Sequence, residues 1–138
     1  MPESALAKKM RLKAGARAAV IGAPGGYLNA LAPLPARVEV SETLDGRFDW
    51  IQVFVRTRAE LARLAPGCVE ALAEDGLLWV SFPKGTSGIQ TDLTRDEGWD
   101  ALADAGLKWV MLISVDSTWS AFSLRRHRPG EPTERARR

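Results

Sequence analysis

The polar residues best suited to chemistry are concentrated in one stretch, PKGTSGIQTDLT, at residues 83–94. A lysine ammonium, hydroxyl groups and glycine amides can together hold a phosphate or a carboxylate. The stretch is not a P-loop, because the order G-x-x-x-x-G-K-[ST] is missing. The alternative is a solvated loop in which Thr91 and Thr94 cap neighbouring structure. The candidate anion-binding residues of this stretch are Lys84, Thr86, Ser87 and Asp92.

A second candidate contact is the glycine-rich turn in VIGAPGGYLNALAPLP, residues 20–35. The amides of Gly25 and Gly26 come at the start of an expected short helix, where the helix dipole favours an anion. Gly22 has no side chain and lets the backbone approach a ligand closely. Pro24 acts against such a contact, because it has no amide hydrogen and adds a ring. The turn is interpreted either as a ligand contact or as a simple reversal of the chain.

Two further charged residues come directly after expected strands. Glu42 lies about 20 residues after the first glycine, where an acid in nucleotide-binding α/β folds accepts hydrogen bonds from ribose hydroxyls. Glu39 falls in the same zone but inside the strand, and in an acid-rich chain the match can also be accidental. Arg56 can make a bidentate contact with an anion. Its alternative role is a surface salt bridge.

The sequence offers few groups for nucleophilic, acid–base or metal chemistry. It has one cysteine, Cys68, and one histidine, His127, so the common zinc-ligand patterns and a disulfide within the chain are excluded. Cys68 falls in a helical pattern, where we expect a small buried hydrophobe. The chain has no paired carboxylates, nucleophile elbow or Cys/His pair. Hydrolase and metal-enzyme functions are therefore not expected.

The apolar pattern predicts short strands that alternate with helices. The expected strands are residues 17–22, 36–40, 48–55 and 77–82, followed by a hairpin of 107–115 and 118–126 with a tight turn at Asp116 and Ser117. The expected helices are residues 26–33, 57–76 and 94–106; Pro66 is expected to kink or divide the second, and Gly76 to end it. The pattern predicts a mostly parallel sheet covered on both faces. Ligands then bind beyond the carboxyl ends of the strands, at residues 22–27, 40–45, 56–58 and 83–92.

The net charge of +2 is unevenly distributed. Residues 1–17 and 125–138 each carry +4, and residues 18–124 carry −6. We divide the chain into a basic leader with a short helix at 1–16, a single α/β domain at 17–126 and a disordered basic tail at 127–138. Basic ends without interleaved aromatics are a weak signal for nucleic acid, which is not the expected partner. The absence of a signal peptide or a long apolar run predicts a cytoplasmic protein that does not contact a membrane.

The segment RLKAGARAAVIGAPGG resembles the entry to class I, Rossmann-like methyltransferases, in which a helix and an apolar strand precede a glycine-rich loop. FDWIQVFV resembles the fourth strand of that family, LAEDGLLWVSFP its fifth, and the closing hairpin its last two strands. The chain between Val40 and Phe48 is too short for the usual third strand and helix. The resemblance therefore implies a shortened, three-layer α/β fold with about six strands in the order 2-1-3-4-6-5.

The chain also resembles a family of small bacterial proteins of unknown function, which share the GAPxGY turn, the PKxxSG…TDLT loop and a TWS near the end. This resemblance implies no activity. We expect a non-catalytic methyltransferase-like domain that binds a small anionic ligand or a protein partner. The alternative is an S-adenosylmethionine-dependent methyltransferase, in which Gly22, Gly26 and Glu42 contact the cofactor and Asp92 or Asp116 acts as base. A second alternative is weak nucleic-acid binding through the basic ends.

Overall fold

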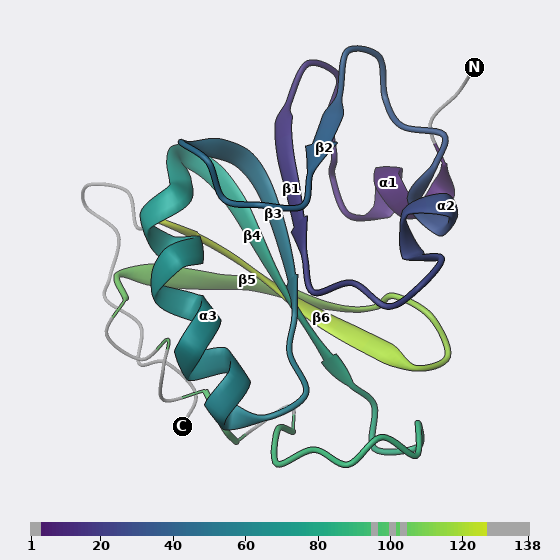
Figure 1. The fold of residues 1–138 in the computed structure, drawn as a ribbon, viewed down its shortest axis with the longest axis vertical. Coiled ribbons are helices and arrows are strands. Elements are labelled where there is room, and N and C mark those ends of the chain that lie inside the picture. Colours follow the sequence, from purple (N-terminus) through teal and green to yellow (C-terminus); the bar gives the residue numbers. More distant parts are fainter. Residues whose placement is uncertain (1–3, 95–96, 100–101, 103–104, 127–138) are drawn as a thin grey trace.

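The computed structural model describes residues 4–94, 97–99, 102 and 105–126. A six-stranded sheet has the order β2-β1-β3-β4-β6-β5, as the resemblance implied (Figure 1). The strands are β1 (Arg17–Ile21), β2 (Glu39–Ser41), β3 (Phe48–Phe54), β4 (Leu72–Pro83), β5 (Leu107–Ser114) and β6 (Trp119–Arg126). The helices are α1 (Ala5–Lys9), α2 (Tyr27–Leu31) and α3 (Arg58–Ala71).

Strands β1 to β5 run in the same direction, and β6, inserted between β4 and β5, runs in the opposite direction. β1 pairs in parallel with β2 and β3, and β3 pairs in parallel with β4. β6 is antiparallel to both β4 and β5. The carboxyl ends of β1, β3 and β4 therefore meet at one edge of the sheet, at the foot of Figure 1. The predicted mostly parallel sheet with a closing antiparallel hairpin is confirmed.

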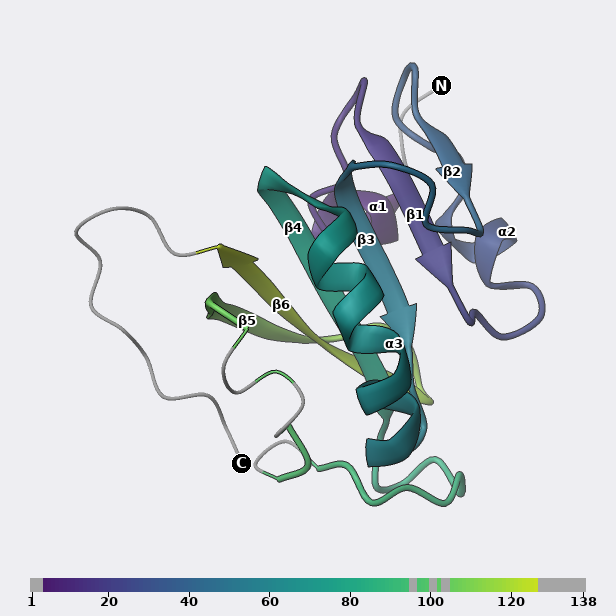
Figure 2. The same ribbon diagram turned by 60° about the vertical axis from the view of Figure 1, so that its left-hand side comes forward.

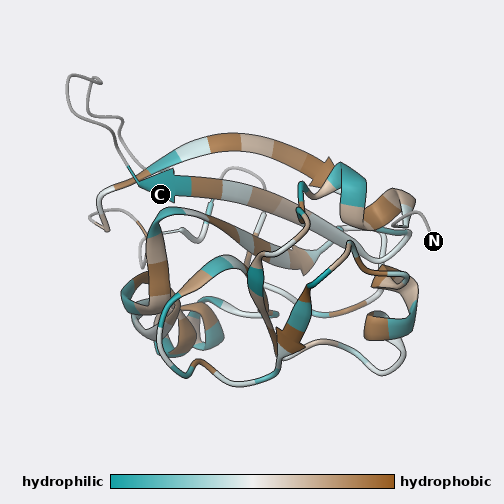
Figure 3. Ribbon diagram, turned by 90° about the horizontal axis from the view of Figure 1, so that it is seen from above, coloured by the Kyte–Doolittle hydropathy of each residue, from teal (hydrophilic) through white to brown (hydrophobic). Residues whose placement is uncertain are grey.

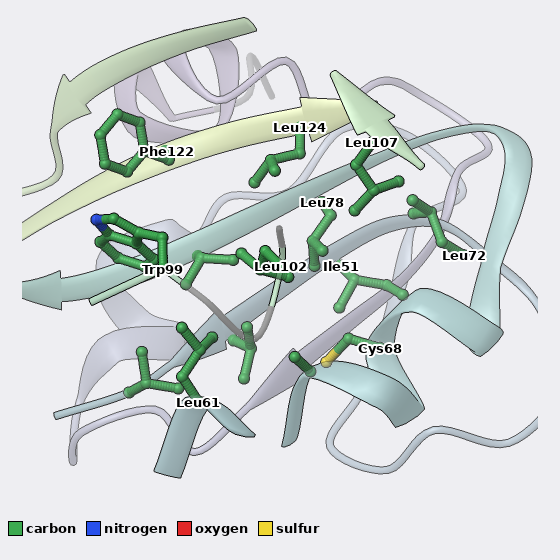
Figure 4. Packing of buried hydrophobic residues seen from close by; sticks show 14 of the residues in the cluster. Ile51, Leu61, Cys68, Leu72, Leu78, Trp99, Leu102, Leu107, Phe122 and Leu124 are labelled. Carbon is green, nitrogen blue, oxygen red and sulfur yellow. The ribbon is translucent and has the colours of Figure 1, made fainter. Parts of the chain in front are cut away.

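The sheet is covered on both faces, which makes three layers (Figures 1 and 2). One face packs under α3, where Ile51, Leu61 and Cys68 join residues of β4 and β6 in a single core (Figure 4). The other face packs under α1 and α2, where Trp50 and Trp79 lie in a second core. Colouring by hydropathy shows hydrophobic stretches along the strands and hydrophilic residues at several strand ends and loops (Figure 3).

Helix α3 starts where the sequence predicts and ends earlier than predicted. The hydroxyl oxygen of its N-cap, Thr57, accepts a hydrogen bond from the Glu60 amide at 3.1 Å. Its buried positions Leu61, Ala65 and Cys68 recur at helical spacing. Of the two effects expected at Pro66, a kink or a division, the division is wrong, because α3 runs on to Ala71. Pro66 lies on the exposed side of the helix, where water can satisfy the carbonyl that loses its amide partner.

The predicted helix end at Gly76 is also wrong, because β4 already begins at Leu72. Leu72 is fully buried and pairs with Phe48, while the next pair is Trp50 with Leu77, so residues 73–76 form an irregularity in β4. A side chain at Gly76 would lie 2.7 Å from Leu72 Cδ1 and 2.9 Å from the Ala73 oxygen. Gly76 is therefore needed for this tight fold of the strand rather than for a helix cap.

Strand β2 also differs from its prediction, since it covers Glu39–Ser41 instead of 36–40. Arg37 has a left-handed backbone with φ of 60°, which an extended strand does not allow. The strand therefore starts at Glu39, three residues later than predicted. In the closing hairpin, Asp116 Oδ1 accepts hydrogen bonds from the amides of Thr118 and Trp119, each at 2.8 Å, which confirms the tight turn at Asp116.

The helix expected at 94–106 lies partly outside the described residues, as does the whole tail 127–138. The described residues 97–99 are not helical, so the predicted helix is wrong at those positions. The hydroxyl of Thr94 accepts a hydrogen bond from the Glu97 amide at 3.1 Å, which closes a local turn. Trp99 and Leu102 are buried in the core under α3. Within the described part of the chain, no helix is long and apolar enough to cross a membrane.

Candidate functional site

A hollow lies where the polar loop 83–94 leaves the carboxyl end of β4. This loop cavity has a volume of about 820 Å³. Its floor comes from three neighbouring strands, with Phe82 on β4, Ser120 on β6 and Leu112 on β5. Thr57 at the start of α3 and the loop itself form the remaining walls. The other lining residues are Pro83, Lys84, Gly85, Ile89, Gln90, Thr91, Asp92, Leu93 and Thr94.

Lys84 is the cation of the loop cavity. Its Nζ donates a hydrogen bond to Ser114 Oγ at 2.6 Å, and its amide donates to the Thr118 oxygen at 2.8 Å. Its own oxygen accepts from the Ser87 amide at 3.0 Å, which closes a turn at the start of the loop. These contacts fix the lysine at the rim, while its ammonium retains two hydrogens for a ligand.

Asp92 lines the loop cavity and also fastens the loop to α3. Its Oδ1 accepts a hydrogen bond from the Arg58 amide at 2.7 Å, and its backbone oxygen accepts from Arg58 Nε at 3.0 Å. A carboxylate is favourable there, because the first amides of a helix have no partner within the helix. One oxygen of Asp92 is thus committed to structure.

The hydroxyl groups of the loop also serve its own backbone. Thr91 Oγ1 accepts a hydrogen bond from the Leu93 amide at 3.0 Å, and Ser87 Oγ accepts from the Ile89 amide at 3.2 Å. Thr86 is exposed, and neither Thr86 nor Ser87 lines the loop cavity. Of the four candidates in this stretch, the structure brings Lys84 and Asp92 to the cavity.

The glycine turn lies at the same edge of the sheet, beyond β1. Gly22 has a φ of +73°, and a side chain there would lie 3.2 Å from the Phe54 oxygen of β3. Gly26 also has a left-handed backbone and is the N-cap of α2, whereas Gly25 and Gly26 face open space. Gly22 is therefore required by a close approach of two backbone segments, and the next two glycines are accessible to a ligand.

Arg56 and Glu42 do not line the loop cavity. The Arg56 guanidinium lies 5.3 Å from the Trp119 ring centroid and 3.9 Å from Glu60 Oε1, so its alternative role as a surface salt bridge is confirmed. Glu42 is exposed just past β2. Because the last residue of β2, Ser41, pairs with Ala19 rather than with the end of β1, Glu42 is set back from the glycine turn.

The two groups with strongly raised pKa values, Cys68 and Tyr27, do not line the loop cavity. Burial raises the pKa of the Cys68 thiol to about 12, which confirms the predicted buried hydrophobe. Burial also raises the pKa of Tyr27, whose hydroxyl donates to Gln52 Oε1 at 2.6 Å. Among the described residues, no cluster of His, Cys, Asp and Glu can hold a metal ion. The loop cavity therefore offers an apolar floor, one ammonium and one carboxylate for binding a small molecule.

Sequence reasoning missed the part of the cavity that comes from the hairpin. Leu112 and Ser120 belong to strands that the sequence predicts, but no local pattern shows that they meet the loop 83–94. Leu112, on the edge strand β5, is 39% exposed and forms part of the cavity wall. For Thr57, the sequence indicates only a position near the start of the helix.

In three dimensions the chain is similar to class I methyltransferases. The ribosomal protein L11 methylase of Lactobacillus delbrueckii subsp. bulgaricus has a TM-score of 0.61 at 18% identity, over 88% of this chain and 75% of that chain. The DhpI–SAH complex has a TM-score of 0.60 at 12% identity, over 88% and 82%. An O-methyltransferase family 2 protein of Planctomyces limnophilus, solved with apigenin, has a TM-score of 0.61 at 15% identity, over 83% and 50%.

No protein-family model and no curated protein matches the chain in sequence. At identities this low the likeness concerns the fold alone. The fold is that of class I methyltransferases in a shortened form, and the chain spans about half the length of the Planctomyces protein. The fold class predicted from the residues is confirmed.

Proposed function

We propose that the chain binds S-adenosylmethionine beyond β1 and β2 and transfers its methyl group to a small acceptor held in the loop cavity. The observation that carries the proposal is a cavity of about 820 Å³ at the carboxyl edge of a methyltransferase fold. The sequence alone favours a non-catalytic domain, so the proposal reverses that preference. The structural neighbours support the catalytic alternative more than the non-catalytic domain.

The residues present fit the cofactor in part. Gly25 and Gly26 face open space and leave room for a ligand beside the backbone. Glu42 is exposed but set back from the glycine turn by the register of β2, and we assign it the hydrogen bonds from the ribose hydroxyls. Pro24 cannot donate a hydrogen bond from its nitrogen. When bound, S-adenosylmethionine supplies an electrophilic methyl group, so the chain itself has to bind and orient the acceptor.

Within the loop cavity, Lys84 is suited to bind a negatively charged group of the acceptor, and the apolar floor to cover its body. Asp92 is the carboxylate in position to accept a proton from the acceptor, through the oxygen that Arg58 leaves unused. Asp116, the other candidate base, accepts two backbone hydrogen bonds in the hairpin turn and does not line the cavity.

Isothermal titration calorimetry of the purified chain with S-adenosylmethionine and S-adenosylhomocysteine tests the proposal. We expect micromolar dissociation constants for both, and a weakening of about tenfold in Glu42→Ala from the loss of charge-assisted hydrogen bonds. Glu74→Ala, which removes another exposed carboxylate, from the irregular part of β4, is the matched control. Absence of binding by both compounds would overturn the proposal.

A second candidate is a non-catalytic domain that binds a small anionic ligand in the loop cavity or a protein partner. It is favoured by Pro24 in the glycine turn and by the commitment of the loop hydroxyls to the loop itself. Titration with phosphate and simple carboxylates distinguishes the two candidates. Anion binding that is lost in Lys84→Met, together with no binding of S-adenosylmethionine, supports the non-catalytic domain.

We also propose a cytoplasmic location, in line with a single cysteine that is buried as a free thiol.

A further inference from the structure

A second hollow lies near the opposite edge of the sheet, where β1 and β2 begin. This edge is at the top of Figure 1. The hollow has a volume of about 580 Å³ and lies between the loop that leaves α1 and the loop that enters β2. The Gly15 amide donates a hydrogen bond to the Ala36 oxygen at 2.9 Å, which ties the two loops together at its base. We call it the amino-edge pocket; Lys8, Arg11 and Lys13 line it, together with Leu12, Ala14, Pro35 and Ala36.

The fold directs the cations of this pocket outward. Met10 and Leu12 are 0% and 2% exposed and anchor the loop in the core under α1, so the residues between and after them face solvent. Arg11 has a left-handed backbone with φ of 59°, which is uncommon for a residue other than glycine. The chain thus tolerates an unfavourable backbone conformation at the position that places a guanidinium on the pocket.

The cations of the amino-edge pocket form no ion pairs among the described residues. Within residues 4–94, 97–99, 102 and 105–126, none of Lys8, Arg11 and Lys13 forms an ion pair. Lys9 provides the contrast, because its Nζ donates to the Ser114 oxygen at 2.6 Å and so fastens α1 to the end of β5. Residues 8–17 carry five Lys or Arg and no acid, so three positive charges on the pocket stay uncompensated locally.

We infer that the amino-edge pocket binds the polyphosphate group of a small ligand, such as a nucleoside triphosphate. Three cations around one concave surface match a compact group of several negative charges. A long polyanion is a poorer match, because it would extend over the body of the chain, where residues 18–124 carry a net charge of −6. The site is independent of the proposed methyl-transfer site, which lies at the other edge of the sheet.

Isothermal titration calorimetry of the full chain with inorganic tripolyphosphate and with ATP tests the inference. We expect binding of both, with an affinity that falls steeply between about 50 and 200 mM salt, as ion-pair contacts require. The triple variant K8Q/R11Q/K13Q should lose binding by at least about tenfold. Arg63→Gln, which removes an exposed arginine of α3, should bind as the parent chain does.

Two further measurements separate loss of the site from loss of the fold and from a general attraction of polyanions. The circular dichroism spectrum of the triple variant should match that of the parent chain, which shows that the variant is folded. Arg11→Gly removes the unfavourable left-handed backbone of an arginine. This variant should keep or raise the melting temperature and should bind tripolyphosphate more weakly. A single-stranded RNA longer than the pocket should bind no tighter than tripolyphosphate. Undetectable binding of tripolyphosphate, unchanged binding by the triple variant, or RNA affinity that rises with RNA length would each overturn the inference.

Discussion

Trp50 and Trp79, on the neighbouring strands β3 and β4, both donate their indole N–H to the same atom, the carbonyl oxygen of Met10. The two distances are 2.8 and 2.9 Å, and all three residues are buried. Met10 is the C-cap of α1, so the carbonyl would otherwise be a buried helix-end group without a partner. The pair of tryptophans therefore joins the first helix to the centre of the sheet.

The shared acceptor predicts that substitutions of the two tryptophans are not additive. In Trp79→Phe the Met10 oxygen keeps its bond from Trp50, so the free energy of unfolding should fall mainly through lost packing, by about 1–3 kcal/mol. The double variant W50F/W79F strands a buried carbonyl. Its loss should exceed the sum of the single losses by about 1 kcal/mol, measured by urea unfolding. Simple additivity would contradict the idea of a shared bond.

A second long-range contact binds the carboxyl end of α3 to strand β6. Arg126 Nη2, on β6, donates to the Val69 and Leu72 oxygens at 2.7 and 2.8 Å, at the carboxyl end of α3. The Val69 oxygen also accepts the amide of the C-cap, Leu72. Arg126→Met should lower the free energy of unfolding by about 1–2 kcal/mol, because it removes both charge-assisted bonds. Arg63→Met, on the exposed surface of the same helix, should change it by less than about 0.5 kcal/mol. Equal effects of the two would refute the capping role.

The contacts of Arg126 and Trp79 show what the sequence can and cannot reveal here. Apolar runs and helical spacing are local, so they predict the six strands and the start of α3 near Thr57, and the resemblance implies the strand order. The end of α3 is decided by Leu72 pairing with Phe48 and by Arg126, which comes from the last strand. The segment 73–76 favours helix locally, and only these tertiary contacts override it.

The same distinction holds for the candidate sites. The polar loop 83–94 and the glycine turn are identifiable from residue types, and the fold brings both to the carboxyl edge. The sequence cannot show that Asp92 binds the start of α3, or that Leu112 forms a cavity wall, because these contacts join segments remote along the chain. The basic residues near α1 are visible in the sequence only as a leader, whereas their arrangement around a pocket depends on the Gly15–Ala36 contact.

The buried thiol of Cys68 predicts a loss of stability at alkaline pH. Burial raises its pKa from near 9 to about 12, so the unfolded chain loses this proton first as the pH rises. The free energy of unfolding should therefore fall by about 1.4 kcal/mol per pH unit between those two values. Tyr27, whose pKa is also raised by burial, acts in the same direction above about pH 10.

Urea unfolding at pH 8 and pH 10 measures this effect, with Cys68→Ala as the comparison. The variant should be less stable at pH 8, because it leaves a small cavity, but should lose less stability between the two pH values by about 1 kcal/mol. Native protein should also react slowly with a thiol reagent until urea is added. An identical pH dependence of the unfolding free energy in both chains would show that burial does not raise the pKa of Cys68.

The attachment of the loop to α3 through Asp92 predicts that the loop cavity and the helix lose stability together. Asp92→Ala removes the acceptor of the Arg58 amide and should lower the free energy of unfolding by about 1 kcal/mol. Asp92→Asn retains an acceptor oxygen and should recover part of that loss. Thr86→Ala, an exposed position of the same loop, is expected to be neutral within about 0.5 kcal/mol.

Hydrogen exchange locates the effect of Asp92→Ala. The amides of Arg58 and Leu93 should exchange faster in this variant, because the first loses its acceptor and the second lies beside the released loop residue. The amide of Val55, which donates to the Ser81 oxygen at 2.9 Å inside the sheet, should keep its protection. Faster exchange at Val55 to the same degree would mean that the substitution loosens the whole domain, and that the cavity wall is not held by Asp92.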